Sequence, residues 1–170
     1  ENKDSPLGLI NSTALTKDGK SLFCAQSTYD SSSDIYKLDL ATNKIERWTD
    51  SEQGEMQKSD MAQPQLIEWT SFDKMKISGF YYPASKKFTG KRPVMINIHG
   101  GPEGQSMASS LGSNNYYTNE MGVALIYPNV RGSSGFGKTY IASDNGFNRM
   151  NSVKDIDALL DWVAKQPELD

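Results

Sequence analysis

The fold is decided by residues 94–102, which read VMINIHGGP. The first five residues form a short run rich in β-branched side chains, a pattern typical of strands buried on both faces. The run stops at three turn-forming residues, Gly100, Gly101 and Pro102, so we expect a strand over 94–98 followed at once by a tight turn. Residues 122–127 predict the next buried strand, and the chain between the two runs is long enough for a right-handed parallel crossover.

The flanking segments extend this into an α/β pattern. Two strands are expected over roughly 65–72 and 75–82, joined at Asp73-Lys74 and ended by Pro83, and a helix is expected near 113–121, closed by Gly122. The last helix is predicted to begin at Ser152, with Asp155 completing a partial capping box. Its expected buried face carries five apolar residues: Val153, Ile156, Leu159, Leu160 and Val163. The order is strand–strand–strand–helix–strand–helix, which indicates layered α/β architecture.

The chain before residue 50 has a different character. Tyr36, Leu38 and Leu40 alternate with Lys37 and Asp39, which is typical of a half-buried antiparallel strand. This segment is about as long as one β-propeller blade. The predicted organisation is the end of a propeller over 1–50, a polar linker over 51–63 and an α/β domain over 64–170.

Composition excludes several classes of function. The 170 residues include 18 basic and 21 acidic side chains, a net charge of -3 that argues against nucleic-acid binding. No apolar run is long enough to span a bilayer, so no membrane partner is expected. Cys24 and His99 are the only cysteine and histidine, so neither a disulfide framework nor an ordinary zinc site is predicted. We expect no metal and no cofactor, and the sequence leaves the compartment and the oligomeric state open.

Residues 132–139 match the phosphate-loop pattern at every fixed position, with Gly132, Gly137, Lys138 and Thr139 in the required places. A true phosphate loop needs a buried strand that ends at the first glycine and a long helix that starts at the lysine. The sequence predicts neither here, which favours a glycine-rich surface loop over a nucleotide site.

Ser106 lies in a Gly-x-Ser-x-Ala stretch that is similar to a nucleophile elbow. An elbow requires a strand directly before the serine, and hydrolases of this class carry their histidine later in the chain. His99 precedes Ser106, so the sequence predicts an ordinary loop serine.

The turn after the strand at 94–98 has two possible roles. Glycines there let backbone amides approach a ligand, and amides fixed in this way suit oxyanion stabilisation. The same residues are equally compatible with a tight strand-exit turn in which His99 packs and hydrogen-bonds locally.

Taken together, in order and spacing, three segments resemble the prolyl oligopeptidase family of serine peptidases: residues 92–104, residues 127–137, and residues 152–155 with Trp162. The likeness is greatest to the acylaminoacyl-peptidase and dipeptidyl-peptidase branch. It extends over about 65–170, and more loosely over 15–49. The resemblance implies the last blade of a β-propeller followed by the N-terminal half of an α/β-hydrolase domain, with short peptides as substrates.

In that family the loop after the third hydrolase strand supplies an oxyanion-hole amide. By resemblance this is Gly101, supported by His99, Gly100 and Pro102. The serine, acid and histidine of the triad are expected beyond Asp170, so the 170 residues alone are predicted to be inactive and to depend on the remainder of their own chain. A catalytically inactive interaction module of the same fold is the alternative that the resemblance leaves open. With the next hydrolase strand absent, we also expect the strand at 94–98 to have an unpaired edge.

Overall fold

The structure is a computed structural model that describes residues 8–101 and 103–170 and divides the chain into two compact units. The first unit covers the chain up to Gln63 together with residues 108–113. The second covers Pro64–Met107 and Asn114–Asp170. Each unit is built on one four-stranded sheet.

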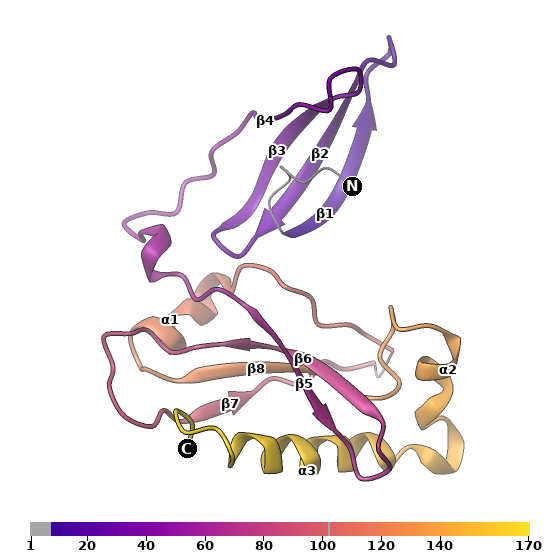
Figure 1. Cartoon of the computed structure of the whole chain (residues 1–170). Helices are drawn as coiled ribbons and strands as arrows, with labels where there is room; N and C mark the ends of the chain where they lie inside the picture. The colour runs from indigo at the N-terminus through magenta and orange to yellow at the C-terminus, as the bar shows by residue number, and fades with distance from the viewer. Residues whose placement is uncertain (1–7, 102) are drawn as a thin grey trace. The chain divides into compact units, whose positions relative to one another are not determined.

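The first unit is an antiparallel sheet whose strands are neighbours in chain order, β1-β2-β3-β4 (Figure 1). The strands are β1 (Gly8–Leu15), β2 (Ser21–Thr28), β3 (Ser31–Asp39) and β4 (Ile45–Arg47). The alternation predicted along β3 is present at Tyr36, which is buried, whereas Leu40 lies just past the strand and is exposed.

A buried carboxylate, that of Asp34 in β3, connects this strand with the end of β4 and the residues that follow it. Asp34 accepts hydrogen bonds from the Ser31 hydroxyl, the Arg47 guanidinium, the Thr49 hydroxyl and the Ser51 backbone amide. Burial raises the pKa of Asp34, but these donors outweigh burial and hold that pKa well below its ordinary value.

The second unit is a mixed sheet in the order β5-β6-β8-β7, as Figure 1 shows. The strands are β5 (Gln65–Thr70), β6 (Lys76–Tyr82), β7 (Val94–Ile96) and β8 (Ala124–Asn129). β5, β6 and β8 pair antiparallel in that order, and β7 pairs with β8 in parallel. The parallel crossover predicted between residues 98 and 123 is therefore confirmed.

The strand β8 carries a proline, which is unusual away from a sheet edge. Pro128 lies opposite Gly79 of β6, and a Cβ on Gly79 would come within 2.9 Å of the Pro128 Cα atom. Glycine at position 79 therefore lets the backbones of β6 and β8 approach closely at residues 127 and 128. On its other side β8 pairs with β7 only as far as Ile126, whose carbonyl accepts the Asn97 N–H at 2.8 Å.

Among the described residues this unit has three α-helices: α1 (Asn115–Asn119), near the predicted 113–121, the short α2 (Lys138–Ile141), and α3 (Asn151–Val163), which runs along the sheet (Figure 1). The core lies between α3 and the sheet, and its buried members are Ile67, Trp69, Ile77, Tyr81, Ala124, Ile126, Leu159, Val163 and Leu169.

The prediction for α3 was correct in location and partly wrong in detail. Met150, and not Ser152, is the N-cap residue, and the Ser152 hydroxyl donates to the Arg149 carbonyl at 2.7 Å. Val153 and Leu160 are about half exposed, whereas Asp155 is fully buried. The buried face of α3 runs through Asp155, Leu159 and Val163. It is rotated from the predicted face because Asp155 is buried against Arg131, which an apolar pattern cannot identify.

The strand β7 is the edge of its sheet, as predicted, but the prediction that it is buried on both faces is wrong. Met95 is 39% exposed and Ile98 is 51% exposed. Val153 and Leu160 add further exposed apolar surface on α3. Among the described residues no strand pairs with the outer edge of β7, although Arg92, two residues before it, forms a parallel bridge with Leu169. This unit therefore combines an open strand edge with exposed apolar side chains.

Candidate functional site

The candidate site is formed by the two loops that leave the parallel strands β7 and β8. Because neighbouring parallel strands end at the same edge of a sheet, residues 97–107 and residues 130–137 emerge side by side. Two contacts join them: Ser134 N–H donates to the Gly104 carbonyl at 2.9 Å, and His99 Nε2 lies 3.0 Å from Ser133 Oγ. Open α/β sheets bind ligands at this edge.

The glycines of the first loop have a conformational role. Gly101 is exposed and has φ +126°, a value that residues with a side chain rarely adopt. A Cβ there would lie 3.0 Å from the Glu103 amide nitrogen. Gly100 is also exposed, and Pro102 lies outside the described residues. The described part of the loop thus has the exposed backbone that an anion-binding amide needs.

His99 is half-buried and hydrogen-bonds locally, as the strand-exit interpretation predicts. Its Nδ1 atom lies 3.3 Å from the Gly100 carbonyl. A Cβ on Gly104 would be 2.9 Å from that nitrogen, so the imidazole packs directly against the loop backbone. The ring therefore lies against Gly100 and Gly104, on either side of Gly101 in the chain.

Ser106 is a loop serine, as predicted, and its backbone is held by one side chain. Asn129 Oδ1 accepts the Ser106 N–H at 2.7 Å, and Asn129 Nδ2 donates to the Ser106 carbonyl at 2.9 Å. The amide of Asn129, at the end of β8, thus satisfies both backbone groups of Ser106.

The loop of residues 130–137 lacks the context of a phosphate loop. The strand ends at Asn129, before Gly132, and the helix at the lysine, α2 (Lys138–Ile141), is four residues long. Gly132 has φ +92°, and a Cβ there would lie 2.5 Å from the carboxylate of the buried Asp144. Close packing against a carboxylate explains this glycine better than a bound phosphate does.

A buried ion-pair network anchors this second loop. Arg131 is 2% exposed, and its guanidinium donates to the fully buried Asp155 carboxylate at 2.8 Å and to Asp73 at 2.8 Å. The Arg131 backbone N–H also donates to Asp155, at 2.9 Å. Ser71 completes the set with a hydrogen bond of 2.5 Å from its hydroxyl to Asp155.

These contacts change the proton affinities of the partners. Hydrogen bonding to Asp73 raises the pKa of Arg131 above its ordinary value despite burial. The same hydrogen bonds lower the pKa of Asp73 to about 2. Both groups are therefore charged at neutral pH, and the start of the second loop is fixed to α3 and to the β5–β6 turn.

Sequence reasoning missed three residues that shape the site: Asn129, Ser133 and Asp155. All three lie in the segments that resemble the peptidase family, and Asp155 was expected in a capping box, but nothing in the pattern linked Ser133 to His99, 34 positions away, or Asp155 to Arg131, 24 positions away. The signal for the burial of Asp155 is that it lies four residues before Leu159, on the apolar side of the helix.

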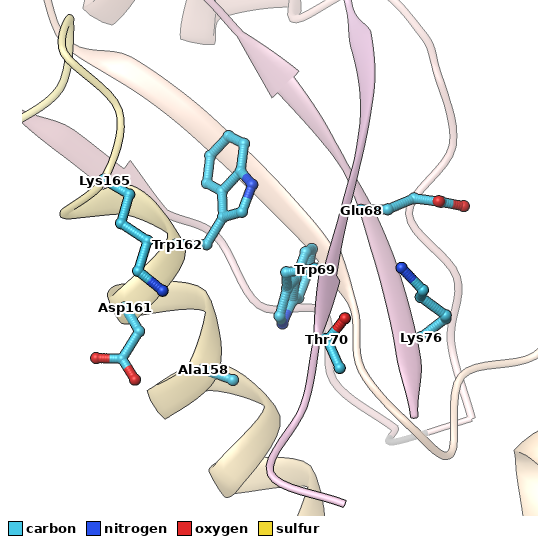
Figure 2. A pocket seen from close by; sticks show the side chains of 8 residues that line it. All are labelled: Glu68, Trp69, Thr70, Lys76, Ala158, Asp161, Trp162 and Lys165. Carbon is cyan, nitrogen blue, oxygen red and sulfur yellow. The ribbon is translucent and has the colours of Figure 1, made fainter. Parts of the chain in front are cut away.

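A separate pocket of about 350 Å³ lies between β5 and α3, and Figure 2 shows its lining. Its walls carry Trp69, Trp162 and side chains of both charges, namely Glu68, Lys76, Asp161 and Lys165. It contains none of the predicted site residues. The mixed charges select no particular ligand chemistry.

Two further observations concern the described residues as a whole. Among them, no group of three or more His, Cys, Asp or Glu side chains is placed to hold a metal ion. Within residues 8–101 and 103–170, every helix is too short or too polar to cross a membrane.

Comparison with known proteins agrees with this geometry. No protein-family model matches the chain. An uncharacterized peptidase of Bacillus subtilis, YuxL, is 23% identical over 167 residues, which is 95% of this chain and 24% of the relative. The crystal structure of a puromycin hydrolase matches 97% of the chain with a TM-score of 0.80 and 21% identity. The acylaminoacyl peptidase of Pyrococcus horikoshii matches 98% with a TM-score of 0.80 and 18% identity.

The chain therefore has an α/β fold that it shares with these peptidases over nearly its whole length. More particularly, the resemblance to the prolyl oligopeptidase family is confirmed at the level of the fold, since solved structures of that family cover the chain. The chain spans about a quarter of the length of these proteins: 24% of the Bacillus relative and 26% of the two solved structures.

Proposed function

We propose that the chain is part of a serine peptidase that hydrolyses short peptides by acyl transfer, and that Gly101 N–H is one of its two oxyanion-hole donors. The observation that carries this proposal is the exposed Gly101 turn at the carboxyl end of β7, braced by the loop that follows β8. His99 and Gly100 support the turn, and Pro102 is assigned to the same role by resemblance. The nucleophilic serine, the acid and the base lie outside residues 1–170 in this proposal.

The proposed organisation is one propeller blade over 1–50, a linker over 51–63 and the first half of an α/β-hydrolase domain over 64–170. Propeller blades are four-stranded antiparallel sheets, which supports the first assignment because β1–β4 pair in chain order. The free edge of β7 and the exposed apolar residues of α3 support the third, since more sheet and helix would cover them.

A peptide substrate is supported by one of the similar proteins. A variant of the puromycin hydrolase has been solved in complex with the peptide PGG. The Gly101 N–H would not discriminate between acyl groups, because an oxyanion-hole amide contacts only the carbonyl oxygen. The choice among peptides would be made by other residues.

The test uses the full-length product of the gene that encodes this chain. We expect a fluorophosphonate probe to label it and a panel of aminoacyl and peptidyl p-nitroanilides to include a substrate. The 170-residue chain is expected to show neither labelling nor turnover. A full-length protein that folds but is not labelled would refute the peptidase proposal and favour the inactive interaction module.

The role of Gly101 has its own variant. Gly101→Pro removes the N–H, and loss of one oxyanion donor lowers kcat by roughly a hundredfold or more. Gly101→Ala is the matched control for backbone strain, since it keeps the N–H but places a Cβ at φ +126°. Unchanged kcat in Gly101→Pro would rule out this donor.

A further inference from the structure

Ser133 lies at the junction of the two loops and is completely buried. Its hydroxyl donates to the Val130 carbonyl at 2.7 Å, and its backbone N–H donates to the same carbonyl at 3.0 Å. The turn from Val130 to Ser133 is therefore closed twice. Asp155 fixes the residue inside this turn, Arg131, through both its backbone and its side chain.

The hydroxyl of Ser133 determines which nitrogen of His99 carries the proton. A serine hydroxyl has one hydrogen, which Ser133 can donate either to the Val130 carbonyl at 2.7 Å or to His99 Nε2 at 3.0 Å. The first arrangement makes Nε2–H the donor to Ser133 Oγ and leaves Nδ1 unprotonated beside the Gly100 carbonyl, which cannot donate to it. The second makes Nδ1–H donate to the Gly100 carbonyl at 3.3 Å and gives up the 2.7 Å bond to Val130. The shorter pair of hydrogen bonds, 2.7 and 3.0 Å, favours the Nε2–H tautomer of the neutral imidazole.

A ring fixed in this way fixes the loop around it. The imidazole packs against Gly104, and the Gly104 carbonyl is held by the Ser134 N–H at 2.9 Å. Residues 99–104 are thus attached to the second loop at both ends, by a side chain at His99 and by a backbone bond at Gly104. Gly101 lies between these two attachments.

We propose that Ser133 is a positioning residue: it holds His99 as the Nε2–H tautomer and thereby sets the conformation of the loop that presents the Gly101 N–H. The catalytic part of this inference rests on the proposed peptidase function, whereas the tautomer does not. A misplaced donor is costly, because a displacement of about 1 Å in a catalytic group lowers the rate on the order of a hundredfold.

The first experiment measures the tautomer directly in the 170-residue chain. His99 is its only histidine, so a long-range ¹H–¹⁵N spectrum contains one imidazole. We expect the neutral ring to give one protonated nitrogen, assigned to Nε2, and one unprotonated nitrogen, assigned to Nδ1. Ser133→Ala is expected to bring the two ¹⁵N shifts together as the tautomers interconvert. An Nδ1–H tautomer in the wild type, or an unchanged spectrum in Ser133→Ala, would overturn the proposal.

Ser152→Ala is the matched control. Ser152 also donates through its hydroxyl to the carbonyl three residues earlier, that of Arg149, at the same 2.7 Å, but no histidine contact is involved. It therefore removes an equivalent hydrogen bond without changing the ring. The backbone amide spectrum of each variant shows whether the chain is still folded.

The second experiment uses the full-length protein and separates positioning from general stability. We expect Ser133→Ala to lower kcat about tenfold to a hundredfold with KM within about twofold, since the oxyanion donor acts mainly in the transition state. His99→Leu should behave alike, whereas His99→Gln keeps an N–H near the position of Nε2 and should recover most of kcat. Equal losses in His99→Leu and His99→Gln, or a change confined to KM, would contradict the proposal.

The two experiments distinguish the two proposals. An inactive wild-type protein would refute the peptidase function and with it the catalytic role of Ser133. The imidazole spectrum would still decide whether Ser133 sets the His99 tautomer. An active protein in which Ser133→Ala retains full kcat would leave the peptidase function standing and refute the positioning role.

Discussion

Replacing either partner of the buried Arg131–Asp155 pair should strongly destabilise the second unit. Both side chains are almost completely buried, and Asp155 accepts from the Arg131 guanidinium, the Arg131 N–H and the Ser71 hydroxyl. Removing one partner of such a pair leaves an uncompensated buried charge, which costs about 3–5 kcal/mol. We therefore expect Asp155→Leu and Arg131→Met each to lower the free energy of unfolding by roughly that amount.

The double variant is the informative member of the series. With both charges removed, no buried charge is left unpaired, and replacing a whole buried ion pair by apolar residues is often close to neutral. We therefore expect the double variant to lose no more than either single variant, which corresponds to a coupling energy of at least about 3 kcal/mol. Asp73, which the exchange also deprives of its partner, is 37% exposed and remains hydrated.

The assay is urea unfolding followed by tryptophan fluorescence. Trp69 and Trp162 belong to the second unit and Trp48 to the first, so a Trp48→Phe background makes the signal specific for the second unit. A loss of about 3 kcal/mol lowers the urea midpoint by roughly 1.5 M for a slope near 2 kcal/mol/M. Single losses below about 1 kcal/mol, or strictly additive effects, would refute the argument that this pair anchors the loop.

Three further predictions concern other residues. The pKa of Asp73 is about 2 in the folded chain against an ordinary 3.8, so its contribution to stability is complete above pH 3.8 and is lost as pH falls through 2. Between pH 5 and pH 2 the urea midpoint should therefore drop less in Asp73→Asn than in the wild type. Equal drops would contradict this prediction. Gly132→Ala places a Cβ at φ +92° and 2.5 Å from the Asp144 carboxylate. We expect this variant to lower the free energy of unfolding, measured with urea, by at least about 1–2 kcal/mol. An unchanged free energy of unfolding would show that the turn can adjust. Titration calorimetry with Mg²⁺ and ATP should detect no binding, and saturable binding that Lys138→Ala abolishes would revive the phosphate-loop interpretation.

The sequence predicted the elements better than their burial. Short β-branched runs and turn residues located the strands of the second sheet, and alternation located β3 of the first, because backbone preferences act locally. The apolar pattern of α3 misled, because Asp155 occupies a buried position that depends on a partner 24 residues earlier. Met95 was expected to be buried, but burial depends on what covers a strand and not on the strand itself.

The candidate site was predicted only in part for the same reason. The HGGP turn could be located because glycine and proline determine local conformation, and the left-handed φ of Gly101 agrees with that reasoning. The contact between His99 and Ser133 could not be predicted from spacing. It exists because two parallel strands end together, which is a property of the sheet.

The proline in β8 has a consequence for where the loop that carries Gly101 begins. In a parallel ladder, a residue that donates its N–H to one residue of the neighbouring strand accepts, at its own carbonyl, from the residue two positions further along. The Asn97 N–H donates to the Ile126 carbonyl, so the Asn97 carbonyl would next have to accept from the N–H of residue 128. Pro128 has no N–H. The pairing must stop at Asn97, two residues before His99, so an imino acid in one strand determines where the neighbouring chain leaves the sheet.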